Sequence, residues 1–114
     1  MSEPTLFEKI LNGDIPSVML HEDDLCGAFH DIAPQAPTHI LIVPRRPLPG
    51  IDAMDADDKS LIGHLFWVAT ELARSEGLED GYRLVINNGQ LGQQSVPHLH
   101  LHLLGNRQMT WPPG

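Results

Sequence analysis

Residues 98–104 read His-Leu-His-Leu-His-Leu-Leu, a run in which three histidines alternate with leucines. Successive side chains of a β-strand point to opposite faces of the sheet, so the imidazoles share one face and the leucines share the other. The leucines are therefore expected to pack in the hydrophobic core. The imidazole face requires a separate explanation, because a buried imidazole needs hydrogen-bond partners.

The pattern around this run predicts a single domain of α+β architecture over residues 1–114. Apolar residues at helical spacing, among them Leu65 and Leu72, predict a long helix over 58–76 that packs on the leucine face, and a shorter pattern predicts a helix over 5–11. Because most connections are short, the strands should form an antiparallel sheet. The five predicted strands are 17–22, 25–30, 39–43, 82–87 and 96–104. An irregular tail is predicted over 105–114.

The composition excludes several classes of protein. The formal net charge is −8, with 15 acidic against 7 basic residues, so a nucleic acid is not expected as the partner. No apolar stretch approaches the roughly 20 residues that span a membrane, and the N-terminus does not resemble a signal peptide. The single cysteine, Cys26, cannot form an intramolecular disulfide and is expected to be buried. A cytoplasmic location is therefore expected.

Three alternating histidines could bind a metal. His98 and His102 lie about 13 Å apart along an extended strand, whereas two nitrogen ligands on one zinc ion lie only about 3.4 Å apart. A zinc site would thus use two of the three imidazoles and a distant ligand such as His39. This is the less favoured alternative, and no metal or other cofactor is expected to be required. A third alternative is that the histidines merely lie on a polar face.

The favoured alternative is chemistry on a phosphate. The central imidazole, His100, can act as a nucleophile if a neighbour fixes its tautomer and other groups hold the phosphate. The flanking imidazoles could supply hydrogen bonds and protons. The loop over 87–95 offers amides, a hydroxyl and glycines for an approaching phosphate, although Asn-Gly there also fits a plain hairpin connection.

These motifs together resemble the histidine triad (HIT) family, and in particular its nucleotide-binding Hint branch. The triad run matches the alternating histidine pattern of the family. The resemblance extends over nearly the whole chain, through FHDIAPQAPTHILIVP, GHL, GYRLVINNG, QSVPHLHLHLLG and the terminal WPPG. It implies a HIT-like fold and a homodimer that binds purine nucleotides and hydrolyses nucleoside 5′-phosphoramidates, such as AMP linked to an amine.

The resemblance also implies roles for the triad. His100 would be the nucleophile and form a nucleotidyl-histidine intermediate that water then cleaves. His102 and Ser95 would contact the phosphate and the leaving-group nitrogen, His98 would orient the site, and His39 would act as a relay partner. Alternatively, His39 would be an ordinary histidine on an edge strand.

The nucleotide would be held by residues on either side of the triad. Asp31 would accept hydrogen bonds from the ribose hydroxyls, Ile32 would wall the purine, and Trp111 would lie near the substrate pocket of the dimer mate. Asp31 could instead form an Asx turn before Pro34. The further residues expected at the nucleotide are His30, for which a structural role is also open, and Asn87, Gln93 and Gln94. His21 and His64 are expected to be structural or surface residues.

The sequence departs from the Hint pattern at Gln93 and Asn106, where that branch has glycine. A side chain at Gln93 would narrow the phosphate wall or demand a different backbone angle. Pro97 has no N–H, so it should lie at an edge or a bulge of its strand. The alternatives to a phosphoramidase are a dinucleoside polyphosphate hydrolase of the same family and a non-catalytic nucleotide-binding or zinc-binding scaffold protein.

Overall fold

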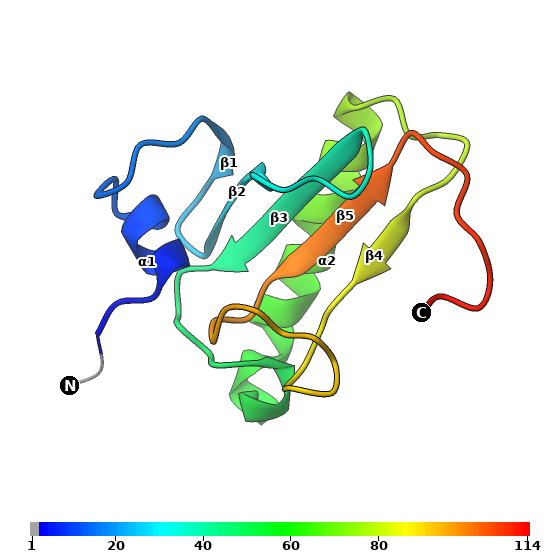
Figure 1. Cartoon of the computed structure of the whole chain (residues 1–114). Coiled ribbons are helices and arrows are strands. Elements are labelled where there is room, and N and C mark those ends of the chain that lie inside the picture. The colour runs from blue at the N-terminus through cyan, green and yellow to red at the C-terminus, as the bar shows by residue number, and fades with distance from the viewer. Residues whose placement is uncertain (1–2) are drawn as a thin grey trace.

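The computed structural model describes residues 3–114 and confirms the α+β architecture (Figure 1). Five strands form one antiparallel sheet in the spatial order β1-β2-β3-β5-β4, so β3 is central and β1 and β4 lie at the edges. The elements in chain order are α1 (Leu6–Leu11), β1 (Met19–Glu22), β2 (Cys26–His30), β3 (Thr38–Pro44), two 3₁₀ turns (Ile51–Ala53 and Ala56–Asp58), α2 (Lys59–Ser75), β4 (Arg83–Val85) and β5 (Leu101–Gly105).

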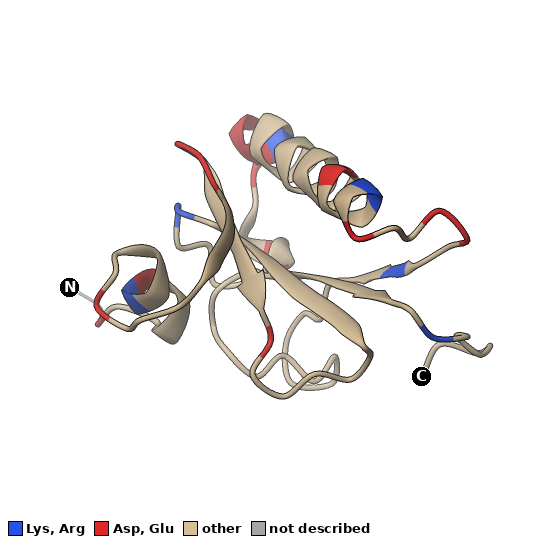
Figure 2. Ribbon diagram, turned by 90° about the horizontal axis from the view of Figure 1, so that it is seen from above, with Lys and Arg blue, Asp and Glu red and all other residues tan. Residues whose placement is uncertain are grey.

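The long helix α2 covers one face of the sheet, as the leucine pattern predicts (Figure 2). Its apolar stripe packs against alternate residues of β3 and β5, which include Ile40, Ile42, Leu101 and Leu103, all with no exposed surface. Leu99 continues this alternation before β5 begins. The leucines of the triad run therefore lie in the main hydrophobic core, between the sheet and α2.

The short helix α1 packs against the opposite face of the sheet (Figure 2). Thr5 caps its N-terminus, and the Thr5 and Glu8 side chains each accept a hydrogen bond from the other residue's backbone N–H. Phe7 and Leu11 of α1 are buried in a second, smaller core. A helix thus covers the imidazole face. The alternative in which the histidines merely lie on a polar face predicted no such cover.

The prediction that the triad strand covers 96–104 is wrong at both ends, because β5 begins at Leu101 and ends at Gly105. The His98 N–H donates to the Val96 carbonyl at 2.8 Å, and the Leu99 N–H donates to the Leu48 carbonyl at 2.7 Å. Pro97 has no N–H to donate. The segment before Leu101 is therefore tied to a turn and to the connection after β3, instead of to a strand.

The charged residues belong mainly to the helices and the connections (Figure 2). The two strands that carry most of the core, β3 and β5, contain no Lys, Arg, Asp or Glu. Among residues 3–114, no helix is both long enough and apolar enough to cross a membrane.

Candidate functional site

A cavity of about 300 Å³ lies on the α1 side of the sheet. Its apolar walls come from α1, the segment after it, and the neighbouring strands. The polar and peripheral residues of this cavity include six of the residues singled out in the sequence: His30, Asp31, Ile32, Ser95, His100 and His102. Residues from β2, the loop before β5 and β5 itself thus meet at one cavity.

His98 lies behind the cavity and both of its ring nitrogens have partners. Nε2 is 2.8 Å from the Pro44 carbonyl oxygen, so Nε2 carries a hydrogen and donates it. Nδ1 is 2.7 Å from the Thr5 hydroxyl and accepts from it, while that hydroxyl accepts from the Glu8 N–H. Because His98 has no exposed surface and no free nitrogen, it cannot contact a ligand in the cavity.

The tautomer of His100 is fixed by His98. Nδ1 of His100 lies 2.7 Å from the His98 carbonyl oxygen, which can only accept, so Nδ1 carries the hydrogen and Nε2 keeps its lone pair. Burial lowers the pKa of His100, although the bond to this carbonyl and the charge of Asp31 oppose the shift. Phe7 contacts the ring edge-on, with 4.8 Å between the ring centroids. His100 is therefore a neutral, fixed imidazole with a lone pair at Nε2.

A second chain of hydrogen bonds fixes His102. The Gln35 N–H donates to Nδ1 of His39 at 3.0 Å, so neutral His39 carries its hydrogen on Nε2. That nitrogen lies 2.9 Å from Nδ1 of His102 and donates to it, which places the remaining hydrogen of His102 on Nε2. Within residues 3–114, Nε2 of His102 is the buried side-chain polar atom that has no hydrogen-bond partner. His102 thus offers an unpartnered N–H donor at the cavity.

The Asp31 side chain forms the Asx turn that was the alternative to a place at the ribose. One carboxylate oxygen accepts from the Ala33 N–H at 2.8 Å, which is the Asx turn, and the other lies 3.5 Å from Nε2 of His39. Ile32 projects from the same turn with 97% of its surface exposed. His39 itself is buried on the central strand, so it is not an edge histidine.

The loop before β5 borders a second, open depression of about 790 Å³. Gln93 and Gln94 line this depression rather than the triad cavity, and Ser95 lines both. The Gln94 side chain donates to the carbonyls of Pro49 and Val96 and accepts from the Gly89 N–H, so it stabilises the loop. The remaining two expected residues, Asn87 and the 82% exposed Trp111, line neither space.

Gln93 and Asn106, the two departures from the Hint pattern, are the non-glycine residues with positive φ in the described part of the chain. Each has φ of 64°, in the left-handed region that glycine adopts at the least cost. The backbone at both positions therefore keeps a glycine-like conformation, although a side chain has replaced the hydrogen.

Gln93→Gly is expected to raise the free energy of unfolding by up to about 1 kcal/mol, because relief of the left-handed strain exceeds the added entropy of the unfolded chain. Urea unfolding measures this change. Gln90→Gly is the matched control: Gln90 is exposed in the same loop but has no positive φ, so its substitution should destabilise. Equal effects of the two substitutions would contradict strain at Gln93.

Asp31, His39 and His102 could also be considered as metal ligands, because their ligand atoms lie within 4.8 Å of one another. Nδ1 of His39, however, accepts from the Gln35 N–H, so neutral His39 carries its hydrogen on the Nε2 that faces His102 and Asp31. A nitrogen that carries a hydrogen has no lone pair for a metal ion. The set is therefore less suited to a metal than its spacing suggests.

The free energy of unfolding is expected to fall as the pH decreases from about 6.5 toward 4. Burial, together with the neighbouring His100 and His39, lowers the pKa of His102 from 6.5 to about 4. Over this range the unfolded chain binds a proton that the folded protein excludes, so acid favours unfolding, and above the range the effect vanishes. Urea unfolding across this pH range measures the slope. His102→Gln should reduce it and His30→Gln, at an exposed histidine, should not; equal slopes in all three proteins would contradict the assignment.

Comparison with known proteins agrees with this fold and site. Residues 12–109 match the family model of the HIT domain. The chain is 51% identical over 114 residues to an uncharacterized HIT-like protein of Synechococcus elongatus, with complete coverage of both chains. It is 53% identical over 113 residues to the 14 kDa zinc-binding protein of Zea mays, covering 97% of this chain and 88% of that one.

Two solved structures show the same architecture. A HIT family hydrolase from Legionella pneumophila superposes with a TM-score of 0.95 at 51% identity, covering 97% of this chain and 100% of that chain. A histidine triad nucleotide-binding protein from Candida albicans superposes with a TM-score of 0.81 at 29% identity, covering 96% of this chain and 83% of that chain.

Proposed function

The chain belongs to the HIT domain family, and from this premise we propose that it is a purine nucleoside phosphoramidase of the Hint branch. The observation that carries the proposal is the pair of fixed tautomers: His100 has a lone pair at Nε2, and His102 has an unpartnered N–H at the same cavity. A nucleophile beside a donor for the developing negative charge is what attack on a phosphorus atom requires.

In the first step, Nε2 of His100 attacks the phosphorus of the substrate and forms a new P–N bond. The bond between phosphorus and the amine breaks, and the amine leaves after taking a proton from Ser95 at the cavity edge. Nδ1 of His100 keeps its hydrogen, and the His98 carbonyl stabilises the positive ring. The His102 N–H holds a phosphoryl oxygen throughout.

In the second step, water attacks the nucleotidyl-histidine. Its oxygen bonds to phosphorus, the bond to Nε2 of His100 breaks, and the proton of the water restores Ser95. The nucleoside monophosphate then leaves, so that one water molecule is consumed for each amine released. No metal or redox partner enters this balance.

The nucleoside would lie along the apolar walls of the 300 Å³ cavity, whose size lies at the small end of ligand sites. The Asp31 carboxylate would accept from the ribose hydroxyls, and Ile32 would cover the purine. Because Gln93 and Gln94 line the neighbouring depression, the phosphate would depend mainly on Ser95 and His102. The nucleotide-binding relative from Candida albicans supports a nucleotide as the ligand.

The test is hydrolysis of adenosine 5′-phosphoramidate, followed by acid quenching and weighing of the intact protein. We expect release of AMP and a transient mass increase of one adenylate that is absent from His100→Ala. A diadenosine polyphosphate is assayed in parallel, and preferential turnover of it would favour the other hydrolase of the family. AMP binding without turnover of either substrate would contradict an enzyme and favour a scaffold.

We further propose that the protein is a cytoplasmic homodimer in which Trp111 reaches the partner's substrate pocket. β4 is an edge strand with an unpaired side, and Trp111 is exposed in the single chain. Sedimentation should give twice the mass of one chain, and Trp111→Ala should change the preference among amine leaving groups more than the release of AMP. A monomeric mass would contradict this assignment.

A further inference from the structure

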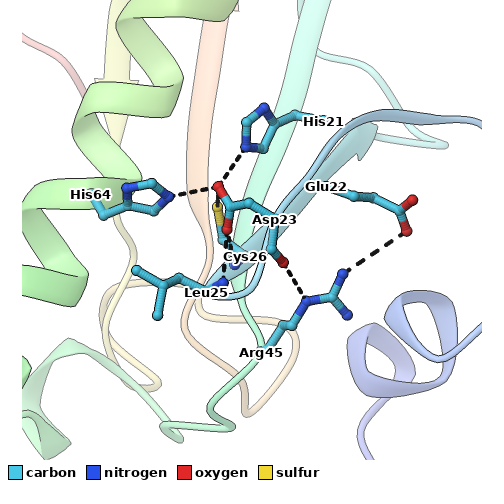
Figure 3. A network of polar contacts seen from close by, with 7 residues as sticks. All are labelled: His21, Glu22, Asp23, Leu25, Cys26, Arg45 and His64. Carbon is cyan, nitrogen blue, oxygen red and sulfur yellow. Dashed lines mark hydrogen bonds and ion pairs between the residues drawn. The ribbon is translucent and has the colours of Figure 1, made fainter.

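Four side chains with metal-binding atoms meet away from the triad: His21, Asp23, Cys26 and His64 (Figure 3). They come from β1, the turn between β1 and β2, the first residue of β2, and α2. One ligand atom from each lies within 4.8 Å of all the others. This cluster stands at the opposite end of β2 from the triad cavity, so it is separate from the proposed active site.

The imidazoles converge on a single oxygen. Nε2 of His21 and Nε2 of His64 each lie 2.6 Å from Oδ2 of Asp23. The Cys26 thiol points at the same oxygen from 3.7 Å (Figure 3). Three donor atoms, from β1, β2 and α2, therefore surround Oδ2 of Asp23.

The Asp23 carboxylate is held in place by its second oxygen. Oδ1 accepts hydrogen bonds from the backbone N–H groups of Leu25 and Cys26, both at 2.8 Å. Burial works to raise the pKa of Asp23, but these bonds and those from the two imidazoles outweigh it and lower the pKa. The carboxylate thus stays ionised, and its orientation is fixed in the way that metal ligands are commonly fixed by outer partners.

The nearest guanidinium does not compete for this carboxylate. The Arg45 side chain donates to the backbone carbonyl of Asp23 at 2.7 Å and lies 4.0 Å from the Glu22 carboxylate (Figure 3). Arg45 therefore leaves the Asp23 carboxylate to the two imidazoles, whose hydrogen bonds a bound cation would replace.

We propose that His21, Asp23, Cys26 and His64 form a structural zinc site. Zinc takes four ligands of these types in tetrahedral geometry, and the imidazole and thiolate donors select against magnesium and calcium. The ion would lie among the four donor atoms, where the Asp23 oxygen would become one ligand instead of accepting both imidazole hydrogens. With all four positions supplied by the protein, no position is left for a substrate, so the site would be structural.

The buried thiol explains how the site would behave without metal. Burial, followed by the charge of Asp23, raises the pKa of Cys26 to about 12, so the free thiol stays protonated. Zinc would displace this proton and bind the thiolate. The bound ion would join α2 to the β1–β2 hairpin, which already meet there through the Asp23–His64 hydrogen bond and apolar packing.

The test is titration of the full-length, metal-free protein with Co²⁺, a spectroscopic substitute for zinc. Cys26 is the only cysteine, so a near-ultraviolet sulfur-to-cobalt charge-transfer band can arise only from its thiolate. We expect one equivalent of Co²⁺ to produce this band and tetrahedral visible bands, and zinc to displace it. Zinc should also raise the Tm, and a chelator should reverse the shift.

Substitutions identify the residues that bind the metal. His64→Gln and His21→Gln, at partly exposed positions, should weaken zinc binding by about 100-fold or more. Cys26→Ser should remove the charge-transfer band, and the two histidine variants keep the test decisive if burial of Cys26 prevents that variant from folding. His39→Gln is the matched control, because it removes a ligand from the other cluster and should leave zinc affinity unchanged.

Three results would overturn the proposal: no binding of Co²⁺ or zinc, binding without the thiolate band, or binding that His39→Gln abolishes and His64→Gln does not. The first would leave the cluster as an ion-pair network, and the last would move the metal to the triad. The readouts involve no turnover, so failure of the phosphoramidase proposal would not decide them.

Discussion

His100→Ala is expected to reduce hydrolysis of adenosine 5′-phosphoramidate by a factor of about 10⁴ or more. The proposed mechanism has one nucleophile, and neither of the other two triad imidazoles can replace it. His98 uses both ring nitrogens on Pro44 and Thr5, and His102 accepts at Nδ1 and carries its hydrogen on Nε2. AMP binding should persist, because the groups proposed to hold the nucleotide remain. Steady-state turnover and equilibrium binding of AMP measure the two effects.

His100→Gln is the matched variant for this experiment. Glutamine fills more of the space beside Phe7 and can donate to the His98 carbonyl, but it has no nucleophilic nitrogen. Both variants should therefore be inactive, while only alanine leaves a cavity. Normal turnover in either variant would contradict the covalent mechanism. Equal loss of AMP binding in both variants would show that His100 acts mainly in binding.

Leu101→Ala, one residue further along the chain, is expected to lower the free energy of unfolding by about 3 kcal/mol. Leu101 has no exposed surface and packs in the core between the sheet and α2. Its removal loses apolar burial and leaves a cavity that the surrounding side chains fill only in part. Urea unfolding at neutral pH measures the change.

Leu104→Ala is the control for Leu101→Ala. Leu104 belongs to the same strand but is only half-buried and lies outside the main core, so its loss should cost less. The folded Leu101→Ala protein should keep its kcat, since its side chain points away from the cavity. A similar cost for both substitutions, or a kcat that falls as far as it does in His100→Ala, would contradict the division between the two faces.

The fold was largely predictable because it follows from local patterns. The apolar period of 58–76 corresponds to α2 within one residue at each end, and Thr5 caps α1 as predicted. The strand that carries the triad was placed wrongly, because its start depends on contacts with the segment after Pro44 that no local pattern reveals.

Six of the residues singled out in the sequence line one cavity, but their hydrogen bonds could not be predicted from the sequence. The triad and Asp31 were identified from the sequence, whereas the burial of His98 was not, since its Thr5 partner lies 93 positions away. The cluster around Asp23 was missed for the same reason. His21, Asp23 and Cys26 are close in sequence, but His64 is 41 positions from Asp23 and reaches it only because α2 crosses the sheet.

The hydrogen bond between the Thr5 hydroxyl and His98 affects when, during synthesis of the chain, the triad can reach its final arrangement. Thr5 leaves the ribosome before the triad does, because it precedes the triad in the chain. Three hydrogen bonds link these residues: the Glu8 N–H donates to the Thr5 hydroxyl, that hydroxyl donates to Nδ1 of His98, and Nδ1 of His100 donates to the His98 carbonyl. All three exist together only after residues 5–8 and the triad have met. A chain without residues 5–8 contains all three histidines but lacks this arrangement. Synthesis must therefore have passed the triad before the arrangement can form.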